Sequence, residues 1–163
     1  MKKFIIPLLI CLVILSGCGA KSAEEVTEPA GQLQLGNPWK SYDTLADAET
    51  ACALAFPIPA GIPEGYTAEC YRVLNGSLLE VQYRKDGTEI TIRVQPGEEA
   101  DISGVYENFT QTETFDRNGA SVTRKQAENC LVYLVCGNGY SFSIYASDPA
   151  ADDICIELLS HIC

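Results

Sequence analysis

Four Asn-Gly or Asp-Gly dipeptides divide the second half of the chain into short segments, and they constrain its fold more than any other feature. These residue pairs tolerate the positive φ angles of type I′ turns, which commonly close two-residue β-hairpins. The segments between them alternate apolar with polar residues, as half-buried strands do. The sequence therefore predicts an antiparallel sheet built largely of hairpins. The dipeptides are Asn75-Gly76, Asp86-Gly87, Asn118-Gly119 and Asn138-Gly139.

The register about Asp86-Gly87 supports this interpretation. A two-residue turn there places opposite charges across from each other on one face and apolar residues across from each other on the other face. We therefore expect a charged surface facing solvent and an apolar surface facing the core. The charged pairs are Arg84 with Glu89 and Glu80 with Arg93, and the apolar pairs are Tyr83 with Ile90, Val81 with Ile92 and Leu79 with Val94.

One helix is expected before the strands in the sequence, and a second helix is expected after them. Thr44 is followed three residues later by Asp47, which predicts a capped helix from Leu45 to about Ala55. Ser147-Asp148-Pro149 predicts the start of the last helix, because proline suits the first helical position. The fold class we predict is α+β: an antiparallel meander of about seven strands, with both helices packed on one face.

The N-terminus has the features of an export signal. Lys2 and Lys3 precede an apolar run that is too short to span a bilayer. Leu15-Ser16-Gly17-Cys18 resembles the lipobox of bacterial lipoproteins, which implies cleavage after Gly17 and lipid attachment at Cys18. We therefore expect a signal peptide over 1–17, a lipidated cysteine and flexible tether over 18–36, and one domain over 37–163, held at the outer face of the cell membrane.

The charge balance narrows the range of partners. The chain has 22 acidic and 11 basic residues and a formal net charge of −11. Loss of Lys2 and Lys3 with the signal would make the mature chain more negative still. Such a charge argues against nucleic acid and anionic lipid surfaces as partners, and it suits a soluble exported domain. We expect a monomeric domain.

Six cysteines lie in the expected domain. An even number in an exported domain is typical of up to three disulfides. The turn about Asn75-Gly76 would place Cys70 opposite Val81 on the apolar face, together with the helix cysteines, so that helix-to-sheet disulfides become feasible. The candidates are Cys52, Cys70, Cys130, Cys136, Cys155 and Cys163.

The segment from Cys130 to Cys136 is apolar on both faces, whereas an antiparallel strand usually shows one face to water. Two interpretations remain open. The long loop near residues 96 to 108 would cover the second face, or Val132 and Leu134 would line a groove for an apolar ligand or partner segment.

Candidate catalytic or metal-binding groups are few. His161 is the only histidine, and its place near the end of the last helix favours a surface role. Glu98, Glu99 and Asp101 could gather around calcium, but a solvated acidic loop is the simpler explanation. We predict a non-enzymatic protein without a metal or cofactor. An enzyme that uses Asp101 or Cys136 is the remaining catalytic hypothesis.

Several short motifs occur in one order, and together they resemble a family of uncharacterised extracytoplasmic domains. The family's members are clostridial lipoproteins, and related domains occur in anti-sigma-factor-like membrane proteins. The resemblance implies an envelope-facing role in sensing or in binding an unidentified envelope protein or peptide. The alternative is a carrier of a lipid or another apolar ligand. The motifs are Asn37-Pro38-Trp39, Asp43-Thr44-Leu45, Pro63-Glu64-Gly65-Tyr66, Asp101-Ile102-Ser103-Gly104 and Gly139-Tyr140-Ser141-Phe142-Ser143.

Overall fold

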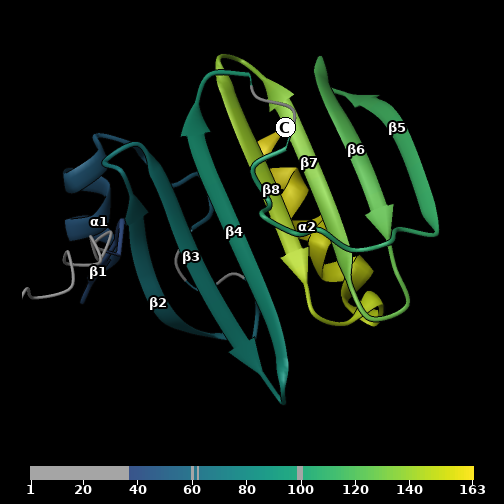
Figure 1. Ribbon diagram of the computed structural model, residues 1–163, viewed down its shortest axis with the longest axis horizontal. Helices are drawn as coiled ribbons and strands as arrows, with labels where there is room; N and C mark the ends of the chain where they lie inside the picture. The colour runs from purple at the N-terminus through teal and green to yellow at the C-terminus, as the bar shows by residue number, and fades with distance from the viewer. Residues whose placement is uncertain (1–36, 60, 62, 99–100) are drawn as a thin grey trace, which may run out of the picture. The chain divides into compact units, whose positions relative to one another are not determined.

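The structure of the protein is a computed structural model, and it describes residues 37–59, 61, 63–98 and 101–163. Within these residues lie one eight-stranded antiparallel sheet and two α-helices (Figure 1), which confirms the predicted α+β class. The strands are β1 Trp39–Tyr42, β2 Thr67–Leu74, β3 Leu78–Lys85, β4 Thr88–Pro96, β5 Gln111–Arg117, β6 Ala120–Gln126, β7 Leu131–Gly137 and β8 Tyr140–Ala146. The helices are α1 Leu45–Cys52 and α2 Asp152–Ile162, the latter preceded by a 3₁₀ turn over Pro149–Ala151.

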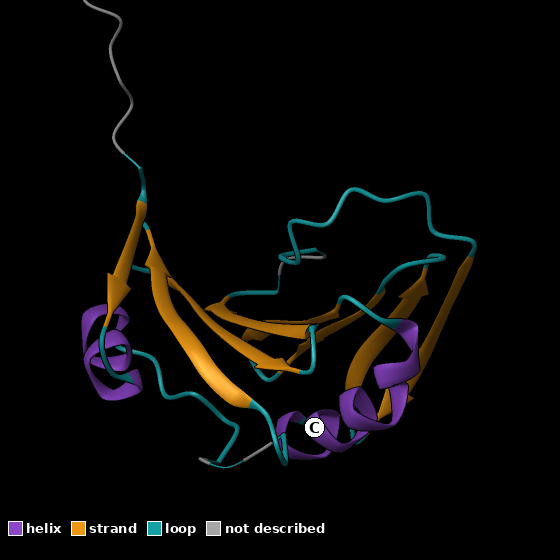
Figure 2. Ribbon diagram, turned by 90° about the horizontal axis from the view of Figure 1, so that it is seen from below, coloured by secondary structure: helices purple, strands orange, loops and turns teal. Residues whose placement is uncertain are grey.

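The sheet consists of two four-stranded meanders placed side by side. The strand order is β1-β2-β3-β4-β8-β7-β6-β5, so β4 pairs with β8 and β5 lies at the far edge. The connection from β4 to β5 must therefore cross the sheet. Figure 2 shows its described residues over one face of the sheet and the two helices on the other. The chain order alone predicts neither this jump nor the short strand β1.

The core lies between the sheet and the helices. Ala48 and Cys52 of α1 belong to the same buried cluster as Leu158 and Leu159 of α2, which confirms that both helices cover one face. The buried strand residues on that face follow the period of two that the sequence predicts. They include Leu79, Val81, Ile90, Ile92, Leu131, Tyr133 and Ile144.

Both helices begin close to where the sequence predicts. The Thr44 hydroxyl accepts a hydrogen bond from the Asp47 backbone N–H at 3.2 Å. Before the last helix, the Asp148 carboxylate accepts a hydrogen bond from the Ala150 N–H at 2.8 Å and so caps the 3₁₀ turn that leads into α2. The first helix ends at Cys52 and not at Ala55, because Ala53 adopts a left-handed φ of 55° as its C-cap.

The register about Asp86-Gly87 is confirmed at every predicted pair. The prediction that its charged face lies in water is wrong for Glu80, whose side chain is fully buried. Glu80 accepts hydrogen bonds from the Nε atoms of Arg72 and Arg93, both at 2.8 Å. Arg72 also stacks on the Trp39 ring, 4.7 Å from its centroid. The Glu80 carboxylate is therefore stabilised by ion pairs beneath an aromatic ring, and not by the water that the sequence leads us to expect around it.

The register about Asn75-Gly76 differs from the prediction by one residue. Leu74 pairs with Leu78, so Ser77 joins the turn, and Cys70 pairs with Gln82 in place of Val81. A shift of one residue moves a side chain to the other face. Cys70 therefore lies on the face opposite the helices, where the sheet separates it from the helix cysteines. No disulfide joins any of the six cysteines in the part of the chain that the structure describes.

Three predictions fall outside the described residues: the signal peptide over 1–17, the lipidation of Cys18 after Gly17, and the tether over 18–36. Among the residues that the structure does describe, no helix has the length and apolar character needed to cross a membrane.

Candidate binding groove beside strand β5

Strand β5 is an exposed edge of the sheet. Among the described residues it pairs only with β6, and every side chain from Gln111 to Asp116 is exposed. An edge strand presents backbone N–H and C=O groups that are free to pair with another chain. The other edge, β1, has four residues, whereas β5 has seven.

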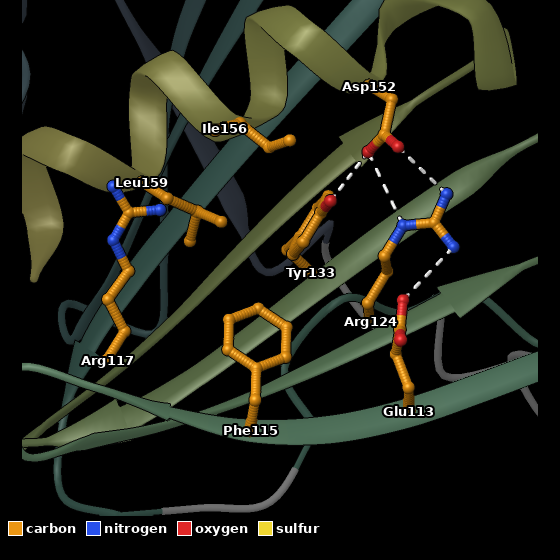
Figure 3. A pocket seen from close by; sticks show the side chains of 8 residues that line it. All are labelled: Glu113, Phe115, Arg117, Arg124, Tyr133, Asp152, Ile156 and Leu159. Carbon is orange, nitrogen blue, oxygen red and sulfur yellow. Dashed lines mark hydrogen bonds and ion pairs between the residues drawn. The ribbon is translucent and has the colours of Figure 1, made fainter.

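An open groove of about 540 Å³ runs between β5 and α2 on the helix face of the sheet (Figure 3). It exists because β5 and β6 extend past α2, so this part of the helix face lacks a cover among the described residues. Phe115 of β5 and Ile156 of α2 border it, with 39% and 44% of their surface exposed. The lining residues are Glu113, Phe115, Arg117, Arg124, Tyr133, Asp152, Ile156 and Leu159.

A paired charge network closes one end of the groove. Arg124 Nη2 donates to Asp152 Oδ2 at 3.0 Å, and Arg124 Nη1 lies 3.5 Å from Glu113 Oε1. The hydrogen bond to Asp152 raises the pKa of Arg124. The Tyr133 hydroxyl donates to Asp152 Oδ1 at 2.6 Å. Burial raises the pKa of Tyr133, and this hydrogen bond raises it further. The charged groups at this end are therefore already engaged with one another.

The other end of the groove holds an available cation. Arg117 projects toward Leu159 in Figure 3. Within the described residues, its guanidinium has no carboxylate partner and no side-chain hydrogen bond, unlike that of Arg124. Burial raises the pKa of the nearby Cys163 thiol, and the positive charge of Arg117 opposes that rise. Arg117 thus offers an anion a place beside apolar side chains.

The second face of β7 is covered. Val132 is fully buried and Leu134 is 5% exposed, so the face that these residues form is not an open groove. The connection from β4 to β5 lies over this face. It is held at one side by Arg93 Nη1, which donates to the Ile102 carbonyl at 3.0 Å, and at the other by Lys125, whose Nζ lies 2.8 Å from Asp101 Oδ2. Of the two sequence interpretations, the covering loop agrees with the structure.

The remaining candidates are dispersed. His161 is exposed near the end of α2. Asp101 accepts hydrogen bonds from Ser103, while Glu99 lies outside the described residues. Cys136 is on β7, on the face away from the helices, and Cys155 is buried on the sheet side of α2. The structure therefore does not bring these groups together into one site.

Sequence reasoning did not single out the groove. The one available signal was Phe115, a large apolar residue among polar and charged neighbours in 111–117. That pattern alone also fits a strand with a small core contact. The groove depends on β5 being the edge and on where α2 ends its cover, and both follow from the strand order.

Comparison with known proteins gives no match, whether to a family model, to a curated protein or to a solved structure.

Proposed function

We propose that this protein is a lipid-anchored lipoprotein of the bacterial envelope whose domain binds an extended segment of a protein or peptide along β5. The lipobox-like Leu15-Ser16-Gly17-Cys18 and the resemblance to extracytoplasmic domains support the location. The observation that favours the binding role is the edge of β5, which has no partner strand within the described part of the chain and lies beside an amphipathic groove. An added strand would gain affinity from main-chain hydrogen bonds and specificity from alternate side chains.

The hydrogen-bond pattern of β5 identifies the groups that would bind. The Thr110 N–H donates to the Gln126 carbonyl at 2.8 Å, so that carbonyl points toward β5. Gln126 pairs with Gln111, and the bonding direction alternates along an antiparallel strand. Residues 111, 113, 115 and 117 therefore bond to β6. The N–H and C=O groups of Thr112, Thr114 and Asp116 point outward and would receive the segment.

The groove selects the chemistry of the segment. An apolar side chain would pack between Phe115 and Ile156, where both partners are now partly exposed. A carboxylate two residues along the segment from that apolar side chain would pair with Arg117, which lacks an acidic partner among the described residues. We therefore expect extended segments that combine an apolar side chain with an acidic one.

Selection of peptides from a random dodecapeptide library on the full chain tests this proposal. Thr114→Pro removes the outward N–H without removing a bond to β6, because proline is tolerated on the free side of an edge strand. Selected peptides should bind the wild type and lose binding to Thr114→Pro. Thr114→Val, which keeps the N–H but lacks the hydroxyl, is the matched control and should bind normally.

The proposal fails if no peptide is enriched above scrambled sequences. It also fails if Thr114→Pro binds the selected peptides as tightly as Thr114→Val does.

A further inference from the structure

We infer that the segment bound along β5 is the β5 strand of a second copy of this chain, in a two-fold antiparallel pair. This inference rests on the proposed function, since it uses the same edge. It replaces the expectation of a monomeric domain. Two-fold dimers use one self-complementary surface on both subunits, and the residues of β5 form such a surface about Phe115.

The self-complementarity follows from aligning two copies antiparallel about Phe115. Each Phe115 then faces the Phe115 of the other copy at the two-fold axis. Each Glu113 faces an Arg117, so two opposite-charge pairs flank the aromatic pair. All three residues lie on the helix face, because residues two apart on a strand share a face.

The backbone permits this register. It places the outward-pointing Thr114 opposite Asp116 of the other copy, so each pair can exchange main-chain hydrogen bonds. Phe115 then stands opposite Phe115 at a non-hydrogen-bonded position, where Cα atoms approach to about 4.5 Å and side chains interact most closely.

Neighbouring registers are unfavourable. A shift in one direction places Glu113 opposite Phe115, and a further shift places Glu113 opposite Glu113. A shift in the other direction places Arg117 opposite Phe115 and Asp116 opposite Asp116. Only the Phe115-centred pairing sets opposite charges together, and like charges directly opposite each other destabilise a sheet.

Arg117 is available for this register, and Glu113 can exchange its 3.5 Å pairing with Arg124 for one with the second copy. Arg117 has no carboxylate partner among the described residues, and the Glu113 side chain is 63% exposed. Arg124 retains Asp152 when Glu113 turns to the second copy. Charged residues on an edge can also serve to block pairing. If all the charges on the strand had the same sign, they would block self-pairing in every register. The opposite charges on either side of Phe115 instead permit self-pairing in the Phe115-centred register.

Charge reversal on the full chain tests the pairing. Glu113→Arg sets two arginines opposite each other in the dimer, and Arg117→Glu sets two glutamates opposite each other. For each variant alone, the dissociation constant of the dimer should be at least about tenfold higher than for the wild type. An equimolar mixture should recover the dimer, because every cross-strand pair in the heterodimer is again Arg with Glu.

Sedimentation equilibrium in density-matched detergent measures the association, and native mass spectrometry separates the heterodimer by mass. Lys40→Glu on the opposite edge, β1, is the control and should leave the dimer unchanged. Unfolding curves check that each variant folds.

A wild type that stays monomeric at every concentration overturns the inference, as does a mixture no better associated than the single variants. If library peptides still bind the monomer and depend on the Thr114 N–H, only the identity of the partner is wrong. If those peptides also fail, the proposed function is wrong.

Discussion

At the scale of single residues, Glu80 is a buried carboxylate that holds two arginines on the face away from the helices. It is fully buried between Arg72 and Arg93, whose side chains are 30% and 18% exposed. Glu80→Ala would leave both guanidinium groups partly buried without their shared carboxylate. We expect the free energy of unfolding to fall by about 3 kcal/mol, measured by urea denaturation.

The control for this prediction is Glu69→Ala. Glu69 pairs with Arg84 at 2.9 Å, and both side chains are about half exposed. Its loss should change the free energy of unfolding by about 0.5 kcal/mol or less. Equal losses in the two variants would contradict the role that we assign to Glu80.

A second residue-scale prediction concerns Tyr133 and alkaline pH. Burial, and then the hydrogen bond to Asp152, raise its pKa above the ordinary value of 10.0. The folded state therefore holds the phenolic proton more tightly than the unfolded state does. The resulting stabilisation is complete below about pH 10 and is lost as pH rises above that value.

Tyr133→Phe should lower the free energy of unfolding at neutral pH by about 1 kcal/mol, because Asp152 loses a donor. Above about pH 10 it should lose stability less steeply than the wild type. Urea titrations at a series of pH values measure both effects. Tyr140→Phe, which removes a tyrosine hydroxyl at an exposed site, is the control. Identical slopes for all three proteins would contradict the prediction.

At the scale of elements, the hairpins differ in how far sequence predicts them. The turn about Asp86-Gly87 has charges and apolar residues that fit only one register, and that register is correct. About Asn75-Gly76 the preceding strand offers fewer constraints, and the inclusion of Ser77 in the turn shifts the register. The bulge between Ala68 and Cys70 then shifts the pairing again.

The order of the strands in the sheet could not be predicted from local sequence patterns. Local patterns specify which residues form strands and which side chains are apolar, but β4 pairs with β8 although three other strands lie between them in the chain. No local pattern records that pairing. Val132 and Leu134 make the second face of β7 apolar, and this indicated that some segment covers it. It did not show that the covering segment is the connection that crosses the sheet. The β5 edge, and with it the groove, could therefore not be predicted.

The crossing connection itself can be tested at Gly104. A Cβ atom there would clash with Arg93 Nη1, and the residue has a φ of +65°. Gly104→Ala should therefore lower the free energy of unfolding through both the backbone conformation and the displaced guanidinium. The backbone contribution alone is about 1 kcal/mol.

Gly76→Ala is the matched control, because Gly76 has a similar φ of +73° and open space around its Cβ position. The excess loss in Gly104→Ala over Gly76→Ala, in urea denaturation, measures the Arg93 contact. No excess would mean that Arg93 does not hold the connection against β4.

At the scale of the whole molecule, the sheet separates the thiols. Cys52, Cys155 and Cys163 belong to the helix face, whereas Cys70 and Cys136 lie on the other. Since no disulfide joins the described cysteines and the sheet stands between these sets, the fold does not depend on disulfides that join the faces. Dithiothreitol should leave the urea midpoint unchanged.

Intact mass after alkylation under denaturing conditions, without reductant, checks the same point. Modification of all six domain cysteines agrees with the structure. A mass that shows paired cysteines, together with a lower urea midpoint after reduction, would instead support the disulfides expected from the sequence.

The proposed function depends on the outward side of β5 being a binding edge. Residue-resolved amide hydrogen exchange of the full chain, with and without a selected dodecapeptide, tests it most directly. Without peptide, and at a protein concentration low enough for the chain to be monomeric, the amides of Thr112, Thr114 and Asp116 should exchange rapidly, whereas those of Glu113, Phe115 and Arg117 should be protected by β6. With peptide, the first set should gain protection. Protection that arises elsewhere, or at neither set, would contradict the claim.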